Sequence, residues 1–244
     1  MATSGVLGAG WGAAMSEEPR AGSAEQVLPR QPAAAVLPAL LPLGLIAGIS
    51  PLATDMYIPA LPELAQNLQT DASVAQLSLT AFLTAFAIGQ LVIGPVSDAV
   101  GRRTIMVVGT AVFALASVAC ALAPSASLLI IARTVQGLAG AAASIVARAM
   151  VTDVLTGVRR ARTIGMLAAI NSVGPVVAPL IGGALLLVGS WRLTFWTLAV
   201  IGGILCVCVI ATFGETLPVD RRAPGISLSA NAGRMLTLLK IPRL

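Results

Sequence analysis

The sequence contains no histidine among its 244 residues, and it is poor in aromatic and charged side chains. The absence of histidine excludes imidazole bases, Ser-His-Asp triads, HExxH zinc sites and haem ligation by histidine. Three cysteines, Cys120, Cys206 and Cys208, lie inside apolar runs without the spacing of a zinc site or a disulfide framework. Aromatic residues make up only 4% of the chain and form no basic aromatic tract, which argues against nucleic-acid binding. The sequence therefore gives no candidate metal site and no nucleic-acid partner.

Charge is scarce as well, and its scarcity predicts the environment of the chain. Charged residues account for 10% of the sequence, whereas a soluble globular protein carries roughly 25%. Hydrophobic residues make up 57%, and the mean hydropathy is +0.93. A surface with so little charge cannot face water over its whole area, so we expect a membrane protein.

The uncharged stretches predict six membrane-spanning helices. A spanning helix needs about 20 mostly apolar residues. Residues 104–147 contain one charge, Arg133, and are too long for a single span, so we divide them at Pro124-Ser125. The resulting all-α bundle has spans at 33–56, 74–96, 104–123, 127–150, 163–188 and 193–213.

The distribution of basic residues predicts the orientation of this bundle. With the N-terminus inside, thirteen of the 15 lysines and arginines fall in inner segments, and only Arg192 falls in an outer one. Such a bias follows the positive-inside rule and places both termini in the cytoplasm. We expect residues 1–32 to be a disordered cytoplasmic tail, 33–213 to be the bundle, and 214–244 to be a cytoplasmic linker. That linker begins a new amphipathic segment and then stops, so the chain looks truncated at the start of a second half.

A short polar segment follows the second predicted span and carries the first motif. Gly94, Asp98, Gly101 and Arg102 fit the pattern G-x-x-x-D-x-x-G-R-R, with the acid and the arginine four residues apart. This pattern resembles the signature loop of the major facilitator superfamily, whose fold has two six-helix halves, each a 3+3 repeat. The resemblance implies an N-terminal half here, and a gate in which Asp98 and Arg102 pair with an acid at the inner end of the fourth span, for which Asp153 is the candidate.

Within the fourth predicted span, Arg133 is followed by Gln136 three residues later. A charged residue inside a membrane helix is costly, so its presence suggests a function or a buried partner. Arg133 lies roughly 9 Å from the predicted outer end, so the side chain could also snorkel outward to the interface. The R-x-x-Q-G pattern resembles the fourth-helix motif of the superfamily that is linked with proton transfer, and this favours the functional interpretation.

The fifth predicted span contains small residues at helical spacing and two prolines. Small residues let helices approach closely, and proline bends a helix, so a plain packing interface is one interpretation. The spacing also resembles the antiporter motif G-x8-G-x3-G-P-x2-G-G of drug/proton exchangers, with alanine in place of one glycine. The residues of this motif are Gly165, Gly174, Ala178, Pro179, Gly182 and Gly183.

Residues 55–62, with the sequence DMYIPALP, follow the first predicted span. They resemble the D-x-Y-x-P-A-L-P stretch of Bcr/CflA-type resistance transporters, and further matches extend the resemblance over about residues 35–244. Asp55 and Arg133 are both expected in the outer half of the bundle. Loss of water favours the protonated carboxyl, whereas a nearby guanidinium favours the ionised one, so a change in their separation would couple proton binding to movement. The alternative is that Asp55 is a solvated cap before Pro59.

Polar residues within the spans are the candidates for substrate binding, although hydrogen bonding between helices explains them nearly as well. They are Tyr57, Gln90, Gln136, Asn171 and Ser172. A mostly apolar cavity suits small amphiphilic, drug-like molecules.

We therefore expect a transporter and not an enzyme: a drug:proton antiporter of the cytoplasmic (inner) membrane, of the kind that exports bicyclomycin or chloramphenicol. It would have no cofactor other than the proton gradient. Its partners would be protons, the lipid bilayer, and either a missing C-terminal half or a second copy. The alternatives left open are a uniporter or sugar symporter, and an inactive or scaffold-like N-terminal fragment.

Overall fold

The computed structural model describes residues 42–217, and this part of the chain is helical with no β-strand. Residues 42–47 are helical and meet a break at Gly48 before the first numbered helix. The elements that follow are α2 (Ile49–Asp55), the 3-10 helix η1 (Ile58–Ala60), α3 (Leu61–Asn67), α4 (Ala72–Val100), α5 (Arg102–Ala121), α6 (Ala126–Val154), α7 (Gly157–Val188) and α8 (Arg192–Thr212).

Five of the described helices, α4 to α8, are long and apolar enough to cross a membrane. Large apolar side chains point away from the bundle along them, among them Leu91, Leu115, Leu187 and Val207. A helix needs about 20 apolar residues to span the hydrocarbon core, and each of these five meets that length. The first predicted span, 33–56, lies partly outside the described residues; its described part is the helical run 42–47 together with α2.

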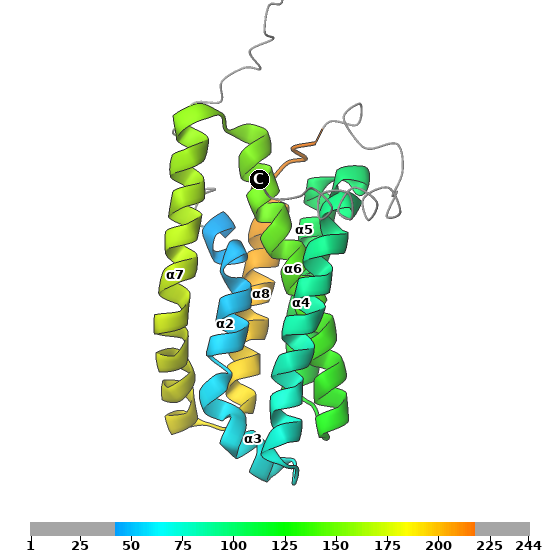
Figure 1. Cartoon of the computed structure of the whole chain (residues 1–244), viewed down its shortest axis with the longest axis vertical. Coiled ribbons are helices and arrows are strands. Elements are labelled where there is room, and N and C mark those ends of the chain that lie inside the picture. Colours follow the sequence, from blue (N-terminus) through cyan, green and yellow to red (C-terminus); the bar gives the residue numbers. More distant parts are fainter. Residues whose placement is uncertain (1–41, 218–244) are drawn as a thin grey trace, which may run out of the picture.

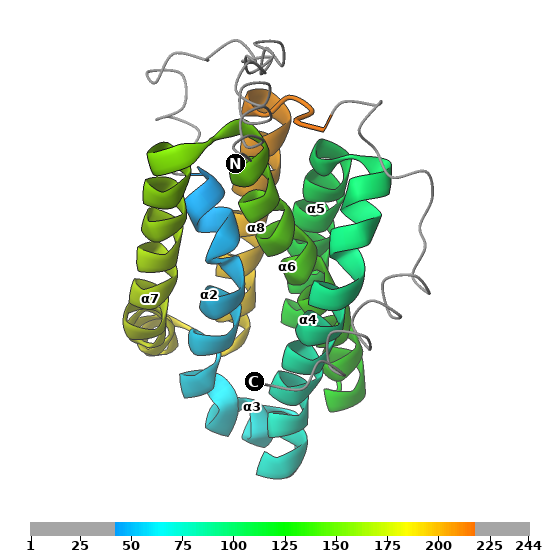
Figure 2. The ribbon, with the colours of Figure 1, turned by 45° about the horizontal axis from the view of Figure 1, so that its top comes forward.

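The long helices lie side by side along the long axis of the molecule (Figure 1, Figure 2). Helix α6 packs against both α4 and α5, α5 also packs against α8, and α7 lies at one edge beside α2. Small residues make the close helix contacts possible. A methyl group built on Gly109 would lie 2.9 Å from the Cβ of Ala142, and one built on Gly89 would lie 2.7 Å from the Cβ of Ala141. Packing through small residues stabilises helix association in lipid, where burial of apolar surface contributes little to association.

Three predicted span ends lie four to six residues short of the helix ends, those of α4, α6 and α7, and the cause is the same. Helix α4 continues through the predicted loop at residues 94–103 as far as Val100, and Gly101 alone separates it from α5. Gly101 has φ of 117°, which a residue with a side chain rarely adopts. Helix α7 begins at Gly157 instead of residue 163. Charged residues mark where the membrane ends, but a helix can continue into water, because its backbone hydrogen bonds remain internal there.

Candidate transport site

Arg133 is completely buried in the described structure, with 0% of its surface exposed. Its guanidinium carbon lies 4.4 Å from the ring centre of Phe82, 4.6 Å from that of Tyr57 and 5.6 Å from that of Phe195. Aromatic faces attract a cation, and more strongly where water is excluded. The guanidinium therefore sits inside the bundle among aromatic rings and does not snorkel to the interface.

Two hydrogen bonds fix one side of this guanidinium. Its Nη1 donates to the backbone carbonyl of Ala53 at 3.1 Å and to Oε1 of Gln136 at 2.8 Å. Gln136 in turn donates from Nε2 to Oγ of Ser117 at 2.7 Å, so α2, α5 and α6 are joined through one chain of bonds. Nε and Nη2 of Arg133 have no hydrogen-bond partner among the described residues. Arg133 therefore holds the last turn of α2 through its backbone, with two donors still unused.

Asp55 lies two residues after Ala53, whose carbonyl Arg133 binds. The carboxylate of Asp55 borders a cavity that Arg133 does not line. This cavity has a volume of about 620 Å³, and Oδ1 of Asp55 accepts a hydrogen bond from Oγ1 of Thr54 at 3.3 Å. Between residues 42 and 217, the ion pairs of the structure do not include Asp55. Asp55 and Arg133 thus occupy the same end of α2 without direct contact, and the backbone of residues 53–55 connects them.

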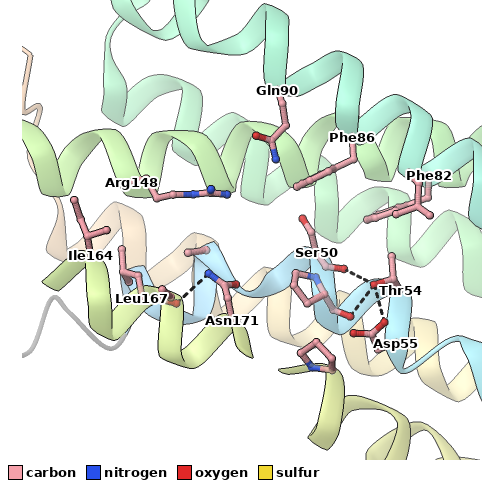
Figure 3. Close-up of a pocket in the computed structure, with 15 residues that line it drawn as sticks. Ser50, Thr54, Asp55, Phe82, Phe86, Gln90, Arg148, Ile164, Leu167 and Asn171 are labelled. Carbon is pink, nitrogen blue, oxygen red and sulfur yellow. Dashed lines mark hydrogen bonds between the residues drawn. The ribbon is translucent and has the colours of Figure 1, made fainter. Parts of the chain in front are cut away.

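The cavity is lined by α2, α4, α6 and α7, and its wall is mostly apolar (Figure 3). Two of the predicted binding residues, Gln90 and Asn171, lie on this wall. Asn171 donates from Nδ2 to the carbonyl of Leu167 at 3.0 Å, and its Oδ1 has no partner within the described part of the chain. The remaining lining residues are Ala47, Ser50, Pro51, Thr54, Asp55, Phe82, Leu83, Phe86, Arg148, Ile164, Leu167, Ala168 and Pro175.

The other three predicted binding residues do not line this cavity. Tyr57 is fully buried, and its hydroxyl lies 2.7 Å from Oγ of Ser78. Gln136 is buried beside Arg133, as described above. Ser172 is exposed on α7 and donates back to the carbonyl of Ala168 at 3.0 Å. The cavity wall also includes side chains that the sequence did not single out as binding groups, among them Phe82, Phe86 and Arg148.

The ends of α4 and α5 that meet at Gly101 lie at the opposite end of the bundle from α3 (Figure 1). Arg102, the first residue of α5, there joins α4, α5 and α6. Its Nη2 lies 2.6 Å from Oδ1 of Asp98, and its Nε donates to Oδ2 of Asp153 at 3.1 Å. Its Nη1 donates to Oγ of Ser97 at 2.5 Å. The structure thus brings together Asp98, Arg102 and Asp153, the three charged residues predicted to form the gate. Gly94 has no atom near the position of a Cβ, so close packing does not account for that glycine.

A further acid, Glu215, reaches the same cluster from the segment after α8. Its Oε1 accepts from the backbone N–H of Arg102 at 2.9 Å and from that of Leu217 at 3.1 Å. Gly101 has no side chain to cap α5, and a carboxylate at a helix N-terminus fills that role while meeting the positive end of the helix dipole. Sequence reasoning missed Glu215, because its distance from Arg102 along the chain hides the contact.

The motif residues of α7 fall into two groups. Ala178 and Gly182 are buried on one face, and a Cβ at Gly182 would collide with the backbone carbonyl of Met56. A Cβ at Gly174 would lie 3.5 Å from that of Pro51, which is ordinary contact. Gly165 and Gly183 have no neighbouring atom within reach of a Cβ in the described structure, and α7 continues as one helix through Pro175 and Pro179. One part of the motif therefore packs against α2 and η1, while the other faces open space.

The family model described as Major Facilitator Superfamily matches residues 43–241, which is most of the chain. The chain belongs to the major facilitator superfamily. The five spanning helices of the described residues are consistent with half of this fold. The MFS-type transporter YdgK of Bacillus subtilis strain 168 is 42% identical over 200 residues, covering 81% of this chain and 50% of YdgK. The multidrug resistance protein MdtL of Escherichia coli O139:H28 is 32% identical over 173 residues, covering 71% of this chain and 44% of MdtL.

Solved transporters of the superfamily share the fold. A bacterial homolog of the human lysosomal transporter Spinster, in an inward-facing and unoccupied conformation, superposes with a TM-score of 0.67 at 22% identity. The match covers 80% of this chain and 46% of that one. The human organic anion transporter MFSD10 gives a TM-score of 0.63 at 19% identity, covering 80% and 51%. The chain thus spans about half the length of the relatives it matches.

Proposed function

We propose that the protein exports small amphiphilic drug-like molecules in exchange for protons, as a Bcr/CflA-type transporter of the cytoplasmic membrane. The observation that carries this proposal is the cavity beside Asp55. Asp55 is an ionisable residue at the end of α2, and the buried Arg133 binds the backbone of that same helix end at Ala53. The similarity to a multidrug resistance protein supports drug efflux. The proposed exchange uses the proton gradient and no other cofactor.

The exchange would work through the end of α2. When Asp55 is ionised, its charge favours a substrate that carries a positive group; when it binds a proton, that attraction is lost. Arg133 holds the carbonyl of Ala53 among three aromatic rings, so a change at Asp55 can reach α4 and α8 through the same turn. Proton binding would thereby release the substrate and alter helix packing in one step.

The cluster around Arg102 would close the cytoplasmic end in one state of the cycle. It ties α4 to α6 and to the segment after α8 through side chains that can separate without unfolding a helix. In this scheme both termini are cytoplasmic, and the substrate lies between this half and a second half. That second half is supplied either by further sequence, by a separate chain or by a second copy.

The test is proton-driven efflux in inverted membrane vesicles that contain the whole protein as its gene encodes it. We expect Asp55→Asn to abolish efflux driven by a pH gradient, and Arg133→Ala to reduce it at least ~10-fold, because it removes a buried cation with its hydrogen bonds. Asp71→Asn is the matched control, since Asp71 is an exposed acid before α4 with no side-chain cap bond. Efflux that is unchanged in both variants, or drug binding without any gradient-driven flux, would contradict the proposal; the latter result favours a scaffold-like half.

A further inference from the structure

Three of the arginines in the described bundle have different surroundings. Arg102 pairs with two carboxylates, and Arg133 lies among three aromatic rings. Arg148 has neither kind of partner. Its Nε donates to the carbonyl of Ser144 at 3.2 Å, and its two terminal nitrogens form no hydrogen bond or ion pair with the residues between 42 and 217.

Arg148 is an exposed residue of α6 whose side chain lines the cavity. It lies six residues before the end of α6 at Val154, or about 9 Å along the helix. Figure 3 shows its side chain extended into the space between α4 and α7, with Gln90 on one side and Asn171 on the other. The bond from Nε to Ser144 holds the guanidinium in this direction, which leaves its planar pair of donors available to a ligand.

Among the described residues that line the cavity, Asp55 is the one other charged residue. In Figure 3 Arg148 is on the left and Asp55 on the lower right, while Phe86 and Phe82 lie along the upper right of the view. The rings of Phe82 and Phe86 are nearly parallel, at 7°, with centres 6.2 Å apart. Phe82 is fully buried, so Phe86 is the ring of this pair that has surface free for a ligand. A volume of about 620 Å³ falls within the range of sites for drug-sized molecules, roughly 300–1,000 Å³.

We propose that this cavity selects zwitterionic amphiphiles, with an anionic group on the terminal nitrogens of Arg148, an aromatic body against Phe86, and a cationic group toward Asp55. This inference rests on the proposed function and gives the substrate class of the same site. A guanidinium binds a carboxylate or a phosphate through two parallel hydrogen bonds, so Arg148 is the specificity-determining residue for the anionic group. A cation without an acidic group uses only the Asp55 end, and an anion without a positive group meets the charge of Asp55.

The experiment uses two probes that differ in one group: a rhodamine with a free carboxylate and its methyl ester. Both carry the same cationic aromatic rings, and only the free acid is zwitterionic. Binding of each to the whole protein in nanodiscs is measured by fluorescence anisotropy at neutral pH without a gradient, with empty nanodiscs as the control for lipid partition. We expect the free acid to bind about 10-fold more tightly than the ester, as for a hydrogen-bonded charge pair.

Variants separate the two ends of the site. Arg148→Gln should bring the ratio of the two dissociation constants close to one by weakening only the free acid, and Arg148→Lys should restore part of the preference. Asp55→Asn should weaken both probes by a similar factor and keep the ratio. Arg159→Gln is the matched control, because Arg159 is an exposed arginine in the first turn of α7 that does not line the cavity.

Several results would overturn the assignment of Arg148. They are equal binding of both probes by the unaltered protein, no binding of either probe, and an Arg148→Gln variant that weakens both equally. The failure of the proposed function is a different result: the preference for the free acid persists while a pH gradient drives no flux. Conversely, gradient-driven flux with no preference between the probes overturns the substrate class alone.

Discussion

Gly182 and its neighbour Gly183 offer a matched pair of substitutions in α7, because their surroundings are opposite. A Cβ at Gly182 would collide with the backbone carbonyl of Met56, and it would also lie 2.9 Å from the carbonyl carbon and 3.0 Å from the Cα of Met56. Backbone cannot move aside as a side chain can, so Gly182→Ala must push α7 away from the end of α2. Gly183 has no neighbouring atom within 4 Å in the described structure.

The magnitude follows from the difference between the two variants. Each replacement gains the same helix propensity, about 1 kcal/mol, so this gain cancels between them. Overpacking at Gly182 costs about 1–3 kcal/mol, which remains as the net difference in the free energy of unfolding. For a chain of this size each kcal/mol lowers Tm by about 2–4 °C, so Gly182→Ala should unfold ~2–12 °C below Gly183→Ala.

The assay is thermal unfolding of the 244-residue chain in detergent, followed by tryptophan fluorescence, to which the buried Trp191 contributes. The two variants should bind detergent equally, so differences in Tm report packing. Equal Tm values for Gly182→Ala and Gly183→Ala would refute the contact between α7 and the backbone of Met56. They would also remove the packing explanation for that glycine of the motif.

Three further substitutions test the polar contacts. Asp153→Asn should reduce vesicle transport while lowering stability by at most about 1 kcal/mol, because its pair with Arg102 is partly exposed; unchanged transport would count against a gate there. Gln136→Leu should lower the free energy of unfolding by about 1–3 kcal/mol, since it leaves Arg133 without a side-chain acceptor, and a chemical denaturation curve that does not shift would contradict this. Glu215→Gln keeps an acceptor but removes the charge at the N-terminus of α5, so Tm should fall by the equivalent of about 0.3–1 kcal/mol in low salt and recover in high salt.

The membrane architecture could be predicted from the sequence because charge is excluded from the hydrocarbon core. The uncharged runs located α4, α5, α6, α7 and α8 to within a few residues at their outer ends. The predicted inner ends of α4, α6 and α7 fall four to six residues short, because these helices extend into charged segments, as α7 does through Arg159, Arg160 and Arg162. The short helices η1 and α3 were missed, since a single turn after Pro59 leaves no hydrophobic period to recognise.

Several residues of the candidate site could be predicted from the sequence, but their contacts with one another mostly could not. The motif spacing brought out Asp98, Arg102 and Asp153, and the structure joins them. The surroundings of Arg133 could not be read from spacing, because its aromatic neighbours come from three separate segments of the chain, at Tyr57, Phe82 and Phe195. A cavity depends on which helix faces turn toward each other, and the sequence does not show this. From the sequence alone, Arg148 was therefore counted only as one of the basic residues predicted on the cytoplasmic side.

The single residue between α4 and α5 fixes the rotational phase of one helix against the other. A residue advances an α-helix by about 100°, so inserting one amino acid beside Gly101 would turn every side chain of α5 by more than a quarter of a circle. Arg102 would then point away from both of its carboxylates, and Gly109 would no longer meet α6. A longer connection would let the two helices rotate independently. With one residue between them, a movement of the end of α4 also displaces Arg102 at the start of α5.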